Sequence, residues 1–160
     1  MRTLRLAVVL TAGALALSAC GNSANKDGKD TSASSAQVKI VATTTQICDY
    51  VTQIATDTSP NATLTLNKTD PAGKKTTVGA AEDKAKSTIN LTCLLAPNAS
   101  AHEHEMTPAQ SKALANADLM LVSGVDLEHF LDDAVKSTGF KGIMGVTSGI
   151  LSSKDVDDIT

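Results

Sequence analysis

The chain has 160 residues, of which 42% are hydrophobic, 19% charged and 2% aromatic, and its formal net charge is −3. This length suits one domain, or one lobe of a larger protein, and argues against a multidomain enzyme. The negative charge and the scarcity of aromatic side chains argue against a surface that binds nucleic acid through its phosphates or by base stacking.

The first twenty residues have the pattern of an export signal. Arg2 and Arg5 precede an apolar stretch, residues 6–17, and small residues follow it up to Cys20. The apolar run 6–19 is too short to span a bilayer. The ending Leu17-Ser-Ala-Cys20 resembles a bacterial lipobox, which implies that residues 1–19 are a signal peptide and that Cys20 becomes lipidated. An ordinary secretory signal with an incidental cysteine is the alternative.

A polar stretch follows the signal. Residues 21–37 contain no branched aliphatic or aromatic side chain and therefore cannot bury apolar surface. We predict that residues 20–37 form a lipidated, flexible tether with an end-to-end distance of roughly 20–25 Å. The folded part is then expected to be extracytoplasmic and lipid-anchored to the bacterial cell membrane.

The other two cysteines form an even pair in this oxidising compartment. With Cys20 attached to lipid, Cys48 and Cys93 remain, and a disulfide between them is favoured over two buried thiols. Such a bridge would close a loop of about 46 residues, which the chain-entropy model values at about 4 kcal/mol.

Strand and helix patterns alternate from residue 38 onward. Apolar, β-branched runs predict strands, and helical spacing of apolar residues predicts the helices between them. Thr107 and Pro108 are typical of a helix start, and Thr44-Thr-Gln46 suits the cap of an earlier helix. The predicted strands are 38–43, 89–95, 119–122 and 143–146, and the predicted helices are 47–55, 108–117 and 127–135. The sequence therefore predicts an α/β fold, a parallel sheet flanked by helices, with ligands at the carboxyl ends of the strands.

One stretch, residues 56–88, interrupts this alternation. It is rich in Thr, Lys, Asp, Ala and Gly and has few large apolar side chains, and structureless connections of this length are uncommon in compact domains. Residues 63–66 suit a short strand, and a turn at 71–73 would make that strand one arm of a hairpin. We predict an exposed insertion, which either covers a site or, as the simpler interpretation, is tolerated surface.

Histidines and acids gather between the predicted strand 89–95 and the helix that begins after Thr107. His102 and His104 alternate there with Glu103 and Glu105. Imidazole and carboxylate groups are suitable ligands for transition-metal ions, so this segment is a candidate metal site, with a solvated loop as the alternative.

The remaining candidates for chemistry are weaker. His129 falls in the predicted helix 127–135, where a surface or interface position is the simplest interpretation. The sequence has no nucleophile elbow, no phosphate-binding loop and no dinucleotide-binding motif, which argues against an enzyme.

Several ordered segments together resemble the metal-binding lipoproteins of zinc and manganese ABC transporters, a family that includes the adhesin lipoproteins. The similarity is strongest over residues 95–108, where LAPNASAHEHEMTP is similar to the family's V-P-P-G-x-D-P-H-x-Y-E-x-T-P stretch. Four further segments match in the same order: KIVATTT at 39–45, ALANADL at 113–119, SGVDLE at 123–128 and VTSGI at 146–150.

This resemblance implies a fold and a site. Residues 38–151 would form the N-terminal lobe of a two-lobe fold like that of periplasmic binding proteins, and 152–160 would begin the next segment. His102 falls on the family's first metal-binding histidine, whereas His104 and Glu105 would at most support it. Family members hold the metal between their lobes with further ligands downstream, so one imidazole does not complete a zinc or manganese site. We therefore expect a fragment, a truncated product without tight binding, or a lobe completed by a partner chain.

The function implied is metal capture rather than catalysis. We expect a substrate-binding lipoprotein that delivers a divalent ion, zinc or manganese, to an ABC permease, with a membrane contact through Cys20 and no nucleic-acid partner. One alternative is a surface lipoprotein involved in cell adhesion, in which metal is structural or absent. Another is a zinc hydrolase that uses His102, His104 and Glu105.

Overall fold

The computed structural model describes residues 36–81 and 83–150. Residue contacts divide the chain into two units, residues 1–31 and 32–160, and every described residue belongs to the second. The predicted signal peptide, Cys20, residues 20–35 of the tether and residues 151–160 lie outside the described residues. Within 36–81 and 83–150, no helix is both long and apolar enough to cross a membrane.

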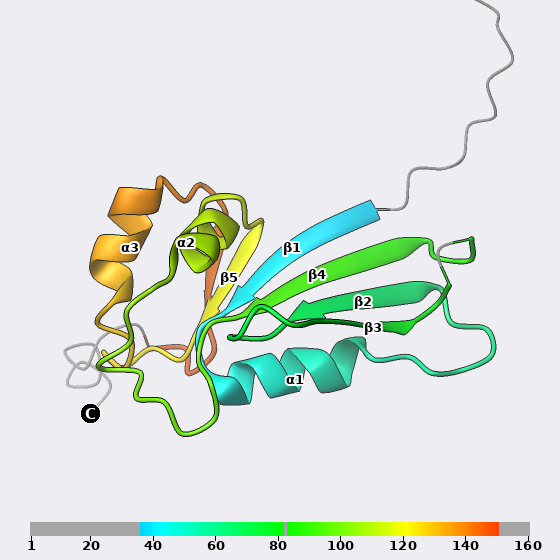
Figure 1. The fold of residues 1–160 in the computed structure, drawn as a ribbon, viewed down its shortest axis with the longest axis horizontal. Coiled ribbons are helices and arrows are strands. Elements are labelled where there is room, and N and C mark those ends of the chain that lie inside the picture. The colour runs from blue at the N-terminus through cyan, green and yellow to red at the C-terminus, as the bar shows by residue number, and fades with distance from the viewer. Residues whose placement is uncertain (1–35, 82, 151–160) are drawn as a thin grey trace, which may run out of the picture. The chain divides into compact units, whose positions relative to one another are not determined.

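A six-stranded sheet lies at the centre of this unit and confirms the predicted α/β class (Figure 1). The strand order is β3-β2-β4-β1-β5-β6, and every neighbouring pair is parallel except β2 with β3. Helix α1 covers one face of the sheet, and α2 and α3 cover the other (Figure 1). The strands are β1 (Ala36–Ala42), β2 (Leu64–Thr69), β3 (Lys75–Gly79), β4 (Ser87–Cys93), β5 (Leu119–Val122) and β6 (Ile143–Val146); the helices are α1 (Thr45–Ala55), α2 (Pro108–Ala115) and α3 (Leu131–Thr138).

The first two helices begin where their capping residues predict. The hydroxyl of Thr44 accepts a hydrogen bond from the backbone N–H of Ile47 at the start of α1. At the start of α2, Thr107 and Gln110 form a reciprocal capping box, with Pro108 at the first helical position. These side chains accept hydrogen bonds from backbone N–H groups that would otherwise have no partner at a helix start.

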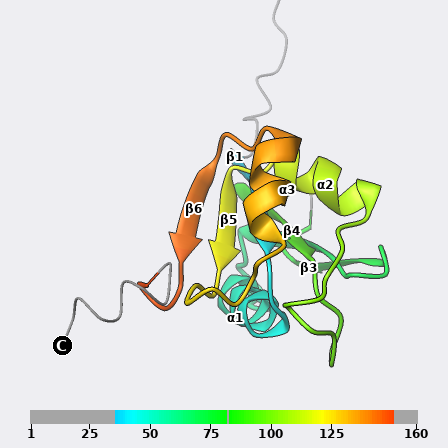
Figure 2. The same cartoon turned by 90° about the vertical axis from the view of Figure 1, so that its left-hand side faces the viewer.

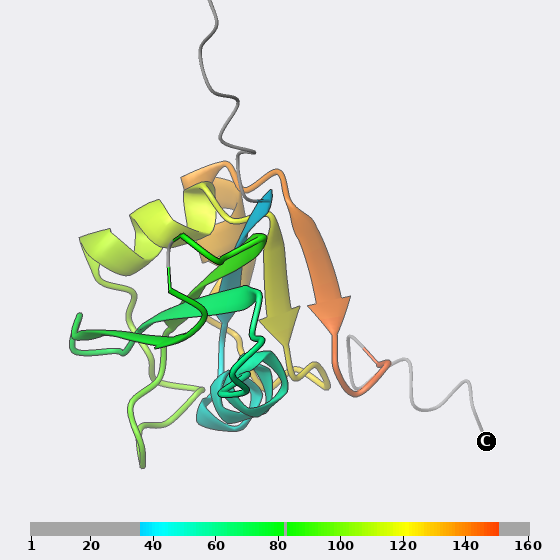
Figure 3. The same cartoon turned by 90° about the vertical axis from the view of Figure 1, so that its right-hand side faces the viewer.

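Two apolar layers hold the helices to the sheet. Because successive strand residues point to opposite faces, Ile40 packs in the cluster beneath α1 while Val41 is buried on the α2 side. Leu114 of α2 and Leu131 of α3 close the second layer. The sheet itself ends at β6, which is the edge strand beyond β5 (Figure 3) and leaves Ile143 71% exposed.

The stretch 56–88 departs from the expected exposed insertion. It does contain a hairpin, β2 with β3, but β2 also pairs in parallel with β4 and lies inside the sheet. Leu66 is 1% exposed and packs in the cluster beneath α1, and the Thr65 hydroxyl donates a 2.7 Å hydrogen bond to the carbonyl of Ala80. Of the two arms of the hairpin, β3 at the edge of the sheet is largely exposed, and residues 58–61 before the hairpin are exposed as well. The expectation fails for β2 because Leu64 and Leu66 pack against α1 and the Thr65 hydroxyl is hydrogen-bonded.

Cys48 of α1 and Cys93 at the end of β4 form a disulfide, with their Cα atoms 5.6 Å apart. Both side chains are buried in the cluster beneath α1. The bond fixes the first turn of α1 to the carboxyl end of the strand from which the histidine-containing segment departs.

Candidate metal site

The carboxyl ends of β1 and β5 lie side by side, and the chain leaves them toward opposite faces of the sheet. After β1 it enters α1 on one face, and after β5 it proceeds to α3 on the other (Figure 2). The two ends are joined by a 3.1 Å hydrogen bond from the backbone N–H of Thr43 to the carbonyl of Leu121. In open α/β sheets, ligands bind at such a reversal of strand order.

Glu128 is the buried carboxylate at this reversal. Its Oε1 accepts hydrogen bonds from the Thr43 hydroxyl (2.8 Å) and from the backbone N–H of Ser123 (2.7 Å), and its Oε2 accepts one from Gly124 (3.2 Å). The side chain is 7% exposed. Charged acceptors make the stronger class of hydrogen bond, so Glu128 ties the segment after β5 to the end of β1. The sequence did not predict this role of Glu128. The residue does belong to the SGVDLE segment, which is one of those that resemble the metal-binding lipoproteins.

Residues 127–130 are not helical, and the predicted helix start at Leu127 is wrong. Gly124, Val125 and Asp126 have positive φ angles, +85°, +56° and +55°, and they reverse the chain before α3 begins at Leu131. A Cβ at position 124 would lie 2.1 Å from the carbonyl oxygen of Ile150, so only glycine fits. This tight turn delivers Glu128 to the end of β1 and leaves His129 exposed just before α3.

The segment after β4 brings His102 to this turn. Its imidazole lies against that of His129, with the ring centroids 5.5 Å apart and the ring planes at 36°. Both side chains are exposed. The sequence predicts a surface or interface position for His129. It does not predict the contact with His102, because 27 residues separate the two and only the neighbouring ends of β4, β1 and β5 bring them together.

His104 has a different environment. Its ring packs edge-on against Phe130 at a centroid distance of 4.9 Å, and its Nε2 is buried without a hydrogen-bond partner. Burial lowers the pKa of His104, and the Gln110 side chain partly opposes this effect. The contact of this ring with Phe130 anchors the segment. The neighbouring Glu105 is exposed, and a supporting role for either residue toward a metal stays a prediction.

Among residues 36–81 and 83–150, no group of three or more His, Cys, Asp or Glu side chains is placed to hold a metal ion. Within the same residues, the imidazoles of His102 and His129 lie against each other.

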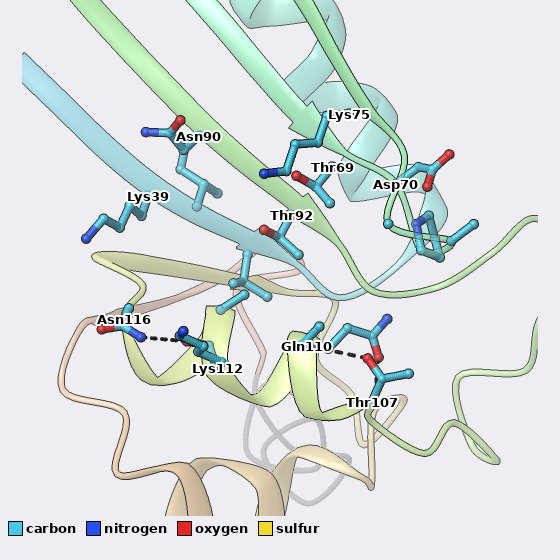
Figure 4. A pocket seen from close by; sticks show the side chains of 17 residues that line it. Lys39, Thr69, Asp70, Lys75, Asn90, Thr92, Thr107, Gln110, Lys112 and Asn116 are labelled. Carbon is cyan, nitrogen blue, oxygen red and sulfur yellow. Dashed lines mark hydrogen bonds between the residues drawn. The ribbon is translucent and has the colours of Figure 1, made fainter.

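A cavity lies elsewhere, beside α2 over β1, β4 and β2 (Figure 4). It has a volume of about 550 Å³, and Lys39, Lys75 and Lys112 are among its lining residues. Its lining has no histidine or cysteine, and Asp70 is its one carboxylate. Three lysines disfavour a cation, so this cavity does not suit a metal ion.

Comparison with known proteins gives a family match. A model of the family described as zinc-uptake complex component A, periplasmic (ZnuA), matches residues 40–159. The chain belongs to the ZnuA family. A search among curated proteins finds no match. The ZnuA match spans both sides of the reversal at β1 and β5 and includes both His102 and His129.

We expect Glu128→Gln to lower the free energy of unfolding by about 2–3 kcal/mol, since the amide loses the charge and turns an N–H₂ group toward other donors. Urea unfolding followed by circular dichroism measures the change. Glu103→Gln removes the same charge from an exposed loop position and should change stability by less than about 0.5 kcal/mol. Equal effects of the two substitutions would contradict the role assigned to Glu128.

Proposed function

We propose that the chain captures zinc outside the cytoplasm and delivers it to the permease of an ABC importer. Periplasmic metal binding for such an importer is the role of the ZnuA family. The observation that carries the proposal is the position of His102, on an exposed segment beside the reversal of strand order. In the proposal, the lipid on Cys20 holds the protein at the membrane close to the permease.

Zinc is the ion proposed because imidazole nitrogen is the donor that the described residues offer. Zn²⁺ prefers nitrogen and sulfur ligands in a tetrahedral arrangement, whereas Mn²⁺ favours sites richer in oxygen. His102 supplies one ligand in this proposal. A second lobe, such as the resemblance implies, supplies the ligands that the described residues do not, and separation of the two lobes releases the ion.

We expect deletion of the gene to reduce uptake of radioactive ⁶⁵Zn by cells grown with a zinc chelator, and to leave manganese uptake unchanged. A wild-type copy should restore zinc uptake, and a copy carrying His102→Ala should not. Equal restoration by both copies, or unchanged zinc uptake after deletion, would contradict the proposal. A defect in cell attachment without a defect in uptake would support an adhesion lipoprotein instead.

A further inference from the structure

We propose that His129 is a metal ligand and that His102 and His129 bind one zinc ion together through their imidazole nitrogens. The inference rests on the proposed function, in which His102 binds the ion, and adds a second ligand from the same chain. It gives His129 a role in place of the surface position that its sequence context indicates.

The distance between the rings fits a shared ion. With zinc–nitrogen bonds of 2.0–2.1 Å, the ion lies about 3.2 Å from the centre of each ring, and a tetrahedral angle places the two centres about 5.2 Å apart. The observed separation is 5.5 Å. The χ2 torsion of histidine is broad, so each ring can turn a nitrogen toward the ion while its backbone stays in place.

The residues on both sides of His129 hold it in this position. Glu128 is fixed to Thr43 and to the end of β5 by its three hydrogen bonds. Phe130 packs against His104, which lies two residues after His102. The two segments are therefore joined by contacts that need no metal. A ligand pair that is already in place binds an ion with less loss of conformational entropy than two mobile loops would.

Both imidazoles are also accessible to an ion from solvent. His102 and His129 are exposed, in contrast to His104, whose Nε2 is buried against Phe130. Of the three histidines of the chain, His102 and His129 thus form an exposed pair whose ring spacing suits a shared ion. The ring of His104 packs against Phe130 instead. His104 is consequently the matched control for a test of the pair.

Titration of the chain with Zn²⁺ against a chromophoric chelator tests the proposal. We expect His129→Phe, which keeps an aromatic ring but has no nitrogen, to weaken zinc binding at least about tenfold, because loss of even an indirect supporting group costs that much. His102→Ala should weaken binding at least as strongly, and His104→Phe, which keeps a ring to pack against Phe130, should weaken it less than either of them. The double variant His102→Ala/His129→Phe should lose less than the product of the two single losses, because the two ligands share one ion.

The outcomes separate this inference from the proposed function. Wild-type affinity in His129→Phe, together with weak binding in His102→Ala, would overturn the role of His129 and leave the proposed function standing. Wild-type affinity in both variants would contradict the proposed function as well. An equal loss in His104→Phe, or strictly multiplicative losses in the double variant, would also overturn the shared site. Unchanged circular dichroism spectra establish that each variant is folded.

Discussion

Replacing His102 by Ala is expected to lower the zinc affinity on the order of a thousandfold. The measurement uses a protein that contains every ligand of the proposed site. A tetrahedral zinc site depends on each of about four ligands, and supporting groups alone are worth 10–100-fold in affinity. Because His102 is exposed, the substitution removes the imidazole without opening a cavity in the core. Calorimetric titration with Zn²⁺ measures the effect.

Glu105→Gln is the control for this substitution. Glu105 lies three residues after His102 in the same exposed segment, so the variant tests whether charge in the segment, rather than the imidazole, attracts the ion. We expect its affinity to fall by no more than about 10–100-fold, the range for a group that only supports a ligand, and thus by much less than in His102→Ala. A thousandfold loss in Glu105→Gln, or no loss in His102→Ala, would contradict the assignment of His102.

The second large effect is expected at the disulfide. Replacing Cys48 and Cys93 together by Ala should lower the free energy of unfolding by about 4 kcal/mol, the chain-entropy value for a loop of this length. The bond closes a separation of 45 residues, which includes the whole β2–β3 hairpin and most of β4. Without it, the unfolded chain gains freedom, and the ends of α1 and β4 lose their covalent link. Chemical denaturation of the double variant measures the change.

Reduction of the wild-type protein provides the control for the lost side-chain volume. Dithiothreitol should lower the stability of the wild type nearly to that of the double variant and should leave the double variant unchanged. Equal stability of the wild type with and without reductant would show that the bond contributes nothing. Zinc titration of the double variant without reductant reports whether the link also maintains the segment that carries His102.

Local sequence signals predicted most of the fold. The strand over 119–122 has the predicted bounds, and the strands that begin at Ala36 and Ser87 lie within two residues of their predicted starts. Thr44 and Thr107 cap helices as expected, because capping depends on residues three or four positions apart. These features need no knowledge of the rest of the chain.

The features that were missed depend on contacts between distant residues. The strand β2 belongs to the sheet through pairing with β4, and its Thr-rich sequence alone does not reveal that pairing. The helical pattern of Leu127, Phe130 and Leu131 predicts a start for α3 that is too early. In the structure Glu128 accepts a hydrogen bond from Thr43, which lies in a distant part of the chain. The contact between His102 and His129 likewise joins two residues that are far apart in the sequence. The sequence therefore predicted the candidate segment that contains His102, and it did not predict that His129 lies beside it.

The role of His102 is tested most directly by a crystal structure of the zinc-loaded protein with anomalous diffraction measured at the zinc edge. We expect an anomalous peak about 2.0–2.1 Å from a ring nitrogen of His102. A zinc ion bound at other residues, with the imidazole of His102 free of metal, would contradict it.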